Sequence, residues 1–172
     1  DVTGTVTRIA DLPDETRVRE GIASLTGNIE QVPPAYSAKQ VDGQRAYAAA
    51  RRGVALQLAA VRVDVHEWAI LEFTGSLLRT RITCGGGTYI RALARDLGRM
   101  SGSAAHLGAL RRVRSGSFDV DNAMPIEQLR DGDVSPRPAI EALPHLPAIT
   151  LTPAEVAHVR QGRLAGATGE GT

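Results

Sequence analysis

Apolar and polar residues recur with two different spacings along the chain, and these spacings predict where helices and strands lie. Apolar residues spaced by three or four follow Asp14, which predicts a helix capped by Asp14 and ended by Gly27 at its C′ position. The residues of this helix that we expect to face inward are Val18, Ile22 and Leu25. This first helix is ordinary scaffold.

Alternating runs predict strands in the first half of the chain. We expect a short strand at 5–7, a strand at 61–65 that continues through 68–73 with a bulge, and a strand at 78–83. The last two form an antiparallel pair that turns near Gly75. His66 falls between apolar and acidic neighbours and is expected to be a surface histidine.

The stretch from Cys84 to Gly98 organises the rest of the chain. Three consecutive glycines, 85–87, allow a sharp turn between the last strand and a helix for which Thr88 is the expected N-cap. The expected core face of this helix consists of Ile90, Leu93, Ala94 and Leu97, and its cationic stripe of Arg91, Arg95 and Arg99.

Tyr89 and Arg91 fall in the first turn of this predicted helix. Backbone donors beside a tyrosine and an arginine could receive an anion or a nucleobase. The alternative is that the glycines only form a tight turn and that the arginines are solvated. The residues alone leave both interpretations open.

Residues 31–53 form a second candidate site. Two prolines exclude regular structure at its start, Asp42-Gly43 marks a turn, and a short helix is expected from Arg45 to Arg52, ended by Gly53. Aromatic and basic residues are mixed there, as is typical where bases stack and phosphates are bound. These residues are Tyr36, Lys39, Arg45, Tyr47, Arg51 and Arg52. The alternative is a surface hairpin whose Tyr47 packs on the core.

The pattern changes after the central helix. We expect a helix at 103–112 and a strand at 113–120, and Leu110 followed by Arg111 and Arg112 places an apolar contact beside cations, as a base-binding cleft requires. A core leucine with solvated neighbours is the alternative. Composition shifts again at 122, and we divide the chain into 1–122 and a smaller module, 123–172.

That smaller module has its own signals. A helical turn is expected at 124–129 and a linker at 131–138. Thr152-Pro153 followed by Glu155 is a complete helix start, and this helix is expected to reach Gly162.

Composition limits the possible chemistry. The formal net charge of the 172 residues is +1, so only local patches of arginine, such as the six between 91 and 114, indicate a nucleic-acid partner. One cysteine excludes an internal disulfide, and the four histidines show no metal-ligand spacing. No signal peptide or long apolar run is present, so we expect a soluble cytoplasmic protein that binds no metal and no membrane.

Four motifs, in order, resemble those of one family. They are Tyr36-Ser37-Ala38 with Lys39 and Gly43, the spacing from Arg45-Ala46-Tyr47 to Arg51-Arg52-Gly53, Gly87-Thr88-Tyr89-Ile90-Arg91 with Leu97-Gly98, and Leu110-Arg111-Arg112 leading to Gly116-Ser117-Phe118. In this order and spacing they are similar to the bacterial TruB-type tRNA pseudouridine synthases over residues 1–165. Cys84-Gly85 stands where the family usually has cysteine and serine.

The resemblance implies a fold and a reaction. The fold would be α+β: a pseudouridine-synthase catalytic fold with a mixed, largely antiparallel sheet flanked by helices, followed by the start of a PUA-like C-terminal module. The enzyme would be an isomerase that converts the T-loop uridine of tRNA to pseudouridine without a metal or organic cofactor. It would bind the T arm of tRNA, with the base flipped from its stack, and act as a monomer.

The resemblance also implies residue roles. Tyr89 would contact the flipped base and take part in proton handling, and Arg91 would pair with a catalytic aspartate and keep it ionised. Leu110 would line the base pocket, with Arg111 and Arg112 beside it. Residues 32–53 would be an insertion that grips the T arm, through Tyr36 and the phosphate contacts Lys39, Arg45, Arg51 and Arg52.

One motif of the family is missing from these residues. Its nucleophilic aspartate belongs to a glycine-threonine-leucine-aspartate-proline motif, which we expect upstream of Asp1; Asp96 matches the end of the helix instead. We therefore expect the chain to be a fragment that is inactive alone. Two other functions stay open: a non-catalytic tRNA-binding or tRNA-folding module on the same scaffold, and a protein-binding α/β domain with solvated arginines.

Overall fold

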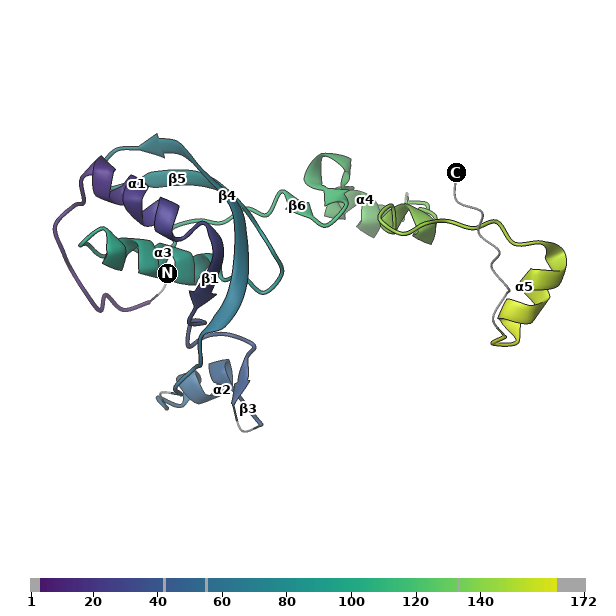
Figure 1. Cartoon of the computed structure of the whole chain (residues 1–172), viewed down its shortest axis with the longest axis horizontal. Helices are drawn as coiled ribbons and strands as arrows, with labels where there is room; N and C mark the ends of the chain where they lie inside the picture. The colour runs from purple at the N-terminus through teal and green to yellow at the C-terminus, as the bar shows by residue number, and fades with distance from the viewer. Residues whose placement is uncertain (1–3, 42, 55, 133, 164–172) are drawn as a thin grey trace. The chain divides into compact units, whose positions relative to one another are not determined.

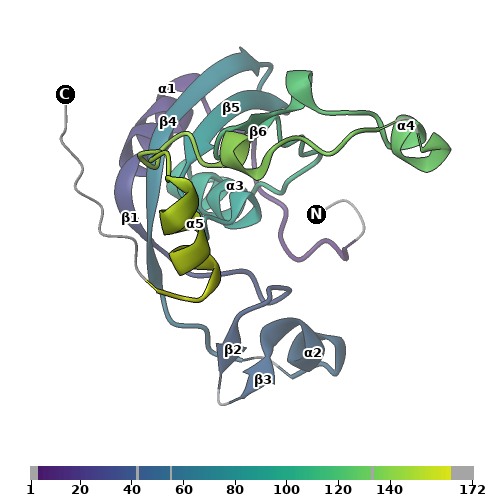
Figure 2. The same ribbon diagram turned by 90° about the vertical axis from the view of Figure 1, so that its right-hand side faces the viewer.

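The computed structural model describes residues 4–41, 43–54, 56–132 and 134–163, and it divides the chain into two compact units. The first unit ends at Leu110 and the second begins at Arg111. Figure 1 and Figure 2 show the elements of both units. Each unit is described by itself.

A three-stranded antiparallel sheet forms the centre of the first unit, in the order β1-β4-β5. Its strands are β1 (Gly27–Gln31), β4 (Val61–Phe73) and β5 (Leu78–Cys84). The predicted β4–β5 hairpin is confirmed, including the turn, where Gly75 has a φ of +85°. The predicted bulge is confirmed too, because the register shifts between Val65 and Glu67 and places His66 in the irregularity.

Helices α1 (Glu15–Ser24) and α3 (Ile90–Met100) pack together on the sheet. The core holds Val18 and Ile22 from α1 and its C-cap Leu25, as predicted, together with Leu97 from α3. From the sheet, Ile29, Trp68, Ile70, Phe73 and Leu78 pack against it. In α3 the side chains of Ala92 and Leu93 are also fully buried. Glycine is required at position 98, since a Cβ there would lie 2.4 Å from the backbone nitrogen of Ala105.

The predicted N-cap of the first helix is confirmed, but the helix ends earlier than predicted. The Asp14 carboxylate accepts the backbone N–H of Arg17 at 2.8 Å. The helix stops at the C-cap Leu25, and Gly27, with a φ of +99°, begins β1 instead of ending the helix. This strand was not predicted from the sequence.

A small hairpin and a helix are inserted between β1 and β4 (Figure 1). The hairpin joins β2 (Gln40–Val41) to β3 (Gln44–Arg45), and α2 (Ala46–Arg51) follows, so the predicted turn and helix are confirmed. Gly43 adopts a φ of +76° in the turn, whereas Asp42 lies outside the described residues. Ala46 and Ala49 of α2 are buried.

Two elements predicted for the first unit are absent. Residues 5–7 form no strand, because no neighbouring strand pairs with them in the described residues. Residues 104–110 form no helix; the chain there lies against Gly98, and the Ser103 hydroxyl donates to the carbonyl of Asp11 at 2.6 Å. Packing overrides a local helical pattern in this segment.

The second unit consists of short elements. They are the hairpin β6 (Arg114–Ser115) and β7 (Phe118–Asp119), the 3₁₀ turns η1 (Val120–Asn122) and η2 (Ala139–Ala142), and the helices α4 (Ile126–Asp131) and α5 (Pro153–Arg160). The single strand predicted for 113–120 is thus a hairpin that turns at Gly116. The helix predicted at 124–129 begins two residues later and reaches Asp131, inside the predicted linker.

The predicted start of the last helix is confirmed. Thr152 and Glu155 form a capping box in which the Thr152 backbone N–H donates to the Glu155 carboxylate at 2.7 Å. The helix stops at Arg160, two residues before Gly162, which adopts a φ of +72°.

Candidate functional site

The predicted sequence of strand, glycine turn and helix is present at residues 78–100. β5 ends at Cys84, whose side chain is half-buried, the backbone N–H of Gly85 donates to the Asp64 carbonyl at 2.8 Å, and Gly87 has a φ of +83°. A Cβ at Gly85 would lie 3.6 Å from the nearest atom, which is ordinary contact distance, so a serine could occupy this position.

Tyr89 rather than Thr88 is the N-cap of α3, so the predicted cap is wrong. Tyr89 has extended dihedral angles (φ −100°, ψ 107°), and no side chain makes a capping hydrogen bond within the helix. The hydroxyl of Thr88 is buried without a hydrogen-bond partner among the described residues. Tyr89 and Arg91 are both half-buried, and they lie two residues apart at the head of the helix.

A buried glutamine takes the place of the missing cap. Gln31, the last residue of β1, is only 1% exposed. Its Oε1 accepts the backbone N–H of Tyr89 at 2.8 Å, and its Nε2 donates to the carbonyl of Tyr89 at 3.2 Å. Gln31 was not predicted as a functional residue. Its only local signal is that it lies on the same face of the strand as Ile29, where an apolar residue would be expected.

The cationic face of α3 holds the segment that follows Gln31. Nη2 of Arg91 donates to the carbonyl of Tyr36 at 2.6 Å, and Nη2 of Arg95 donates to the carbonyl of Val32 at 2.8 Å. Arg95 also binds both carboxylate oxygens of Asp96, at 2.7 and 2.8 Å. Two of the arginines predicted to form a stripe are therefore committed to internal contacts, and Asp96 is held in an ion pair.

The predicted RNA-gripping residues lie on β3 and α2, next to their ends, and in the segment that leads into β2. Lys39, Arg45, Arg51 and Arg52 are exposed, and Tyr36 is 55% exposed. The guanidinium of Arg51 lies 5.7 Å from the centre of the Tyr47 ring, which places a cation over an aromatic face. The Tyr47 backbone N–H donates to the carbonyl of Ser37, so this hydrogen bond joins the start of α2 to the segment before β2.

The remaining predicted residues stand at the boundary between the units. Leu110 is 61% exposed in the first unit, and Arg111 and Arg112 are exposed in the second. Their shared role in a base pocket stays a prediction.

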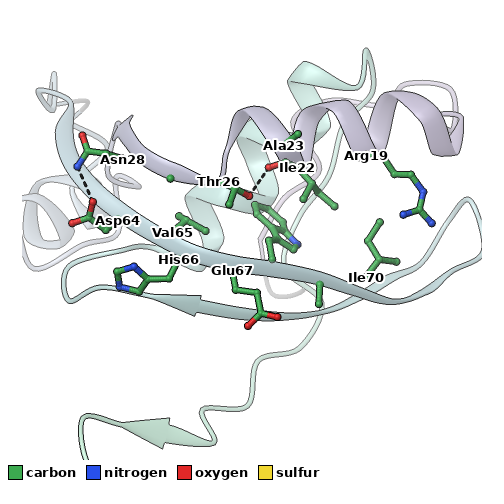
Figure 3. Close-up of a pocket in the computed structure, with 13 residues that line it drawn as sticks. Arg19, Ile22, Ala23, Thr26, Asn28, Asp64, Val65, His66, Glu67 and Ile70 are labelled. Carbon is green, nitrogen blue, oxygen red and sulfur yellow. Dashed lines mark hydrogen bonds between the residues drawn. The ribbon is translucent and has the colours of Figure 1, made fainter.

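A cavity of about 880 Å³ opens between the end of α1 and β4 (Figure 3). Asn28 Nδ2 donates to Asp64 Oδ1 at 2.7 Å at one end of it, and Arg19 lies at the other. A second cavity, of about 320 Å³, lies between residues 4–8 and the arginines Arg95 and Arg99. Neither cavity is lined by Tyr89 or Arg91.

The described residues contain neither a cluster of metal ligands nor a membrane-spanning helix. No group of three or more His, Cys, Asp or Glu side chains there is arranged to hold a metal ion. No described helix is both long and apolar enough to cross a membrane.

The fold is shared with a solved structure. A chain of a Cbf5-Nop10-Gar1 complex superposes with a TM-score of 0.63 at 24% sequence identity, covering 92% of this chain and 45% of that one. The α+β class with a largely antiparallel sheet is thereby confirmed, and every described strand pair is antiparallel.

Two family models match the sequence. Residues 1–90 match the N-terminal domain of the TruB family pseudouridylate synthases, and residues 91–143 match the C-terminal domain of tRNA pseudouridylate synthase B. The chain belongs to the TruB family. The predicted family is confirmed, whereas the predicted division at residue 122 and the PUA-like character of the end stay predictions.

Curated relatives named tRNA pseudouridine synthase B agree with this placement. The protein of Mycobacteroides abscessus is 44% identical over 165 residues, covering 92% of this chain and 55% of that protein. Those of Aromatoleum aromaticum (42%; 87% and 50%) and Solibacter usitatus (39%; 86% and 52%) are similar. The chain thus spans about half the length of the curated relatives it matches.

Proposed function

We propose that this chain is part of a tRNA pseudouridine synthase that isomerises a uridine in the T loop of tRNA to pseudouridine. The match to the TruB family over residues 1–90 carries the proposal. The relatives of this chain are named tRNA pseudouridine synthase B. The proposed reaction breaks the glycosidic bond from N1 of uracil to the ribose and forms a bond from C5 to the same ribose carbon. The proton on C5 is removed and N1 takes up a proton, so atoms and electrons balance and the reaction requires no oxidant or co-reactant.

The head of α3 supports the roles of Tyr89 and Arg91. In this proposal an aspartate attacks the nucleoside, Arg91 keeps that carboxylate ionised, and Tyr89 contacts the flipped base. One Arg91 nitrogen, Nη2, donates to the Tyr36 carbonyl. A guanidinium carries five N–H donors, so donors remain for a carboxylate.

The hairpin and α2 support a role in binding RNA. Their exposed cations can contact phosphates, and the pairing of Arg51 with Tyr47 fixes one guanidinium at the surface. In the same proposal the T arm is the bound part of tRNA, the enzyme acts as a monomer in the cytoplasm without a cofactor, and Leu110, Arg111 and Arg112 border the base.

The decisive test measures pseudouridine formation by the full-length gene product on an unmodified tRNA transcript. Arg91→Ala should abolish turnover while tRNA affinity changes little, and Arg51→Ala should mainly weaken binding. Arg62→Ala is the matched control, because Arg62 is an exposed arginine on β4 outside the site. Absence of pseudouridine with the wild-type protein would refute the proposal, and the reverse pattern in the variants would refute the residue roles.

Salt dependence distinguishes the other functions. If tRNA binds through phosphate contacts, its affinity falls steeply between low and moderate salt concentrations. The slope of log affinity against log salt concentration is close to the number of contacts. Steep salt dependence without turnover would favour a non-catalytic tRNA-binding module. Absence of tRNA binding would favour a protein-binding domain.

A further inference from the structure

The strongest unassigned feature is the buried amide of Gln31. Among the largest side chains with less than 2% exposure, those of Leu93, Gln31 and Val65, only that of Gln31 is polar. Burying an amide without hydrogen-bond partners lowers stability by on the order of 1–3 kcal/mol, so the two hydrogen bonds of Gln31 are needed to offset its burial. Both polar atoms of Gln31 are used on one residue, Tyr89.

Tyr89 needs this support because of where it stands. Its carbonyl already accepts the backbone N–H groups of Ala92 and Leu93, at 3.0 and 3.1 Å, and so begins α3. Its own N–H precedes the helix and would otherwise have no acceptor, since no helix side chain caps it. The glycines at 85–87 just before it restrict the backbone least of all residues. Gln31 therefore supplies the hydrogen bonds to Tyr89 that no helix side chain supplies.

The contact also joins two parts of the proposed site. The chain passes from Gln31 directly into the segment whose Val32 and Tyr36 carbonyls are held by Arg95 and Arg91. That segment leads to the β2–β3 hairpin and α2. Three successive attachments thus fasten the start of the insertion to the first half of α3, and the one made by Gln31 is the most deeply buried.

We infer that Gln31 is a positioning residue: by holding both backbone groups of Tyr89 it sets the placement of Tyr89 and Arg91 for the isomerisation. This inference rests on the proposed function. It concerns the rate of the chemical step, because misplacing catalytic groups by about 1 Å can lower rates by about a hundredfold without removing any of them. The exposed cations that would bind tRNA are left in place.

The test compares Gln31→Met and Gln31→Glu with wild type in the full-length gene product. Methionine keeps the length of the side chain but offers no N–H or oxygen. We expect a fall in kcat of about 10- to 100-fold, with the Kd for tRNA unchanged within about twofold. Glu30→Gln is the matched control, because Glu30 is the exposed neighbour on the same strand and should behave as wild type.

The Gln31→Glu variant adds a pH signature. Its carboxylate can accept the N–H of Tyr89 but cannot donate to the carbonyl, whereas a protonated carboxyl can do both. Burial beside a carbonyl disfavours the charged form. The activity of Gln31→Glu relative to wild type should therefore rise as the pH is lowered. If circular dichroism shows the same folded fraction at the pH values compared, the rescue does not come from a merely structural role.

A readout without catalysis separates this inference from the proposed function. Hydrogen exchange at the Tyr89 amide should be faster in Gln31→Met than in wild type at the same global stability. If the wild-type protein makes no pseudouridine, the proposed function fails while this exchange still tests the contact. Unchanged kcat and unchanged Tyr89 exchange in Gln31→Met would overturn the inference, as would a loss of activity explained entirely by unfolded protein.

Discussion

The two units of this chain are stabilised in different ways. In the first, α1, α3 and the sheet enclose residues such as Val18 and Leu93, which are distant in sequence and fully or almost fully buried. In the second, no residue within 111–132 or 134–163 is buried, and Leu129 and Ile140 are 62% and 63% exposed. Its structure depends mostly on contacts between near neighbours, such as the capping box and the ion pair of Arg137 with Glu141.

This difference predicts which substitutions affect several elements and which affect only one. A substitution in the first unit disturbs several elements at once, because its core is shared. A substitution in the second should act on one helix or turn. The following predictions test that contrast, beginning with the largest effect.

Leu93→Ala should destabilise the chain by about 2–5 kcal/mol, because it empties a fully buried site in the core. Leu129→Ala, the same truncation in α4, should change stability by less than about 0.5 kcal/mol. Urea unfolding followed by circular dichroism measures both. An equal loss for the two variants would show that Leu129 is covered as completely as Leu93 and would remove the contrast.

Gly98→Ala should cost about 1–3 kcal/mol, because its Cβ would lie 2.4 Å from the Ala105 nitrogen and 2.9 Å from the Ala104 carbonyl carbon. Gly132→Ala should cost about 1 kcal/mol through its φ of +74° and loosen only the end of α4. Gly108→Ala is the control, since nothing lies within 4 Å of its Cβ position. Thermal unfolding and amide exchange report the global and local effects; tolerance of Gly98→Ala would mean that this close approach relaxes freely.

The smallest effect concerns pH at α5. Hydrogen bonds from the backbone and then the side chain of Thr152 lower the pKa of Glu155 below its ordinary value of 4.5. A lowered pKa means that the folded helix favours the carboxylate, so the cap contributes above pH 4.5 and is lost as the pH falls through the lowered pKa. Protection of the Thr152 amide against exchange, relative to an unstructured peptide at the same pH, should fall in that range without any change in global unfolding. Glu155→Gln should abolish the pH dependence, because a side-chain amide does not titrate; its persistence would assign it to another group.

The sequence predicted best those elements that depend on local signals. The cap at Asp14, the turn at Gly75 and the helix start at Thr152 are encoded by neighbouring residues and are confirmed. The failures depend on distant partners. β1 exists because it pairs with β4, and the helix expected at 103–112 is absent because that segment packs against Gly98.

The same distinction holds within the candidate site. Tyr89 and Arg91 could be predicted as neighbours because two positions separate them on one helix. The contacts of Gln31 with Tyr89 and of Arg91 with the Tyr36 carbonyl span 58 and 55 residues. Periodicity and caps carry no information about contacts of that range. The residue that fastens the site was therefore found only in the folded chain.

Cys84 gives this arrangement a practical handle. It is the only thiol in the sequence, and it ends β5 half-buried, directly before the three glycines at 85–87. A maleimide reagent will attach at this one place, faster whenever the neighbouring backbone opens. The rate of labelling, measured by mass spectrometry, therefore reports how often the backbone just before α3 opens.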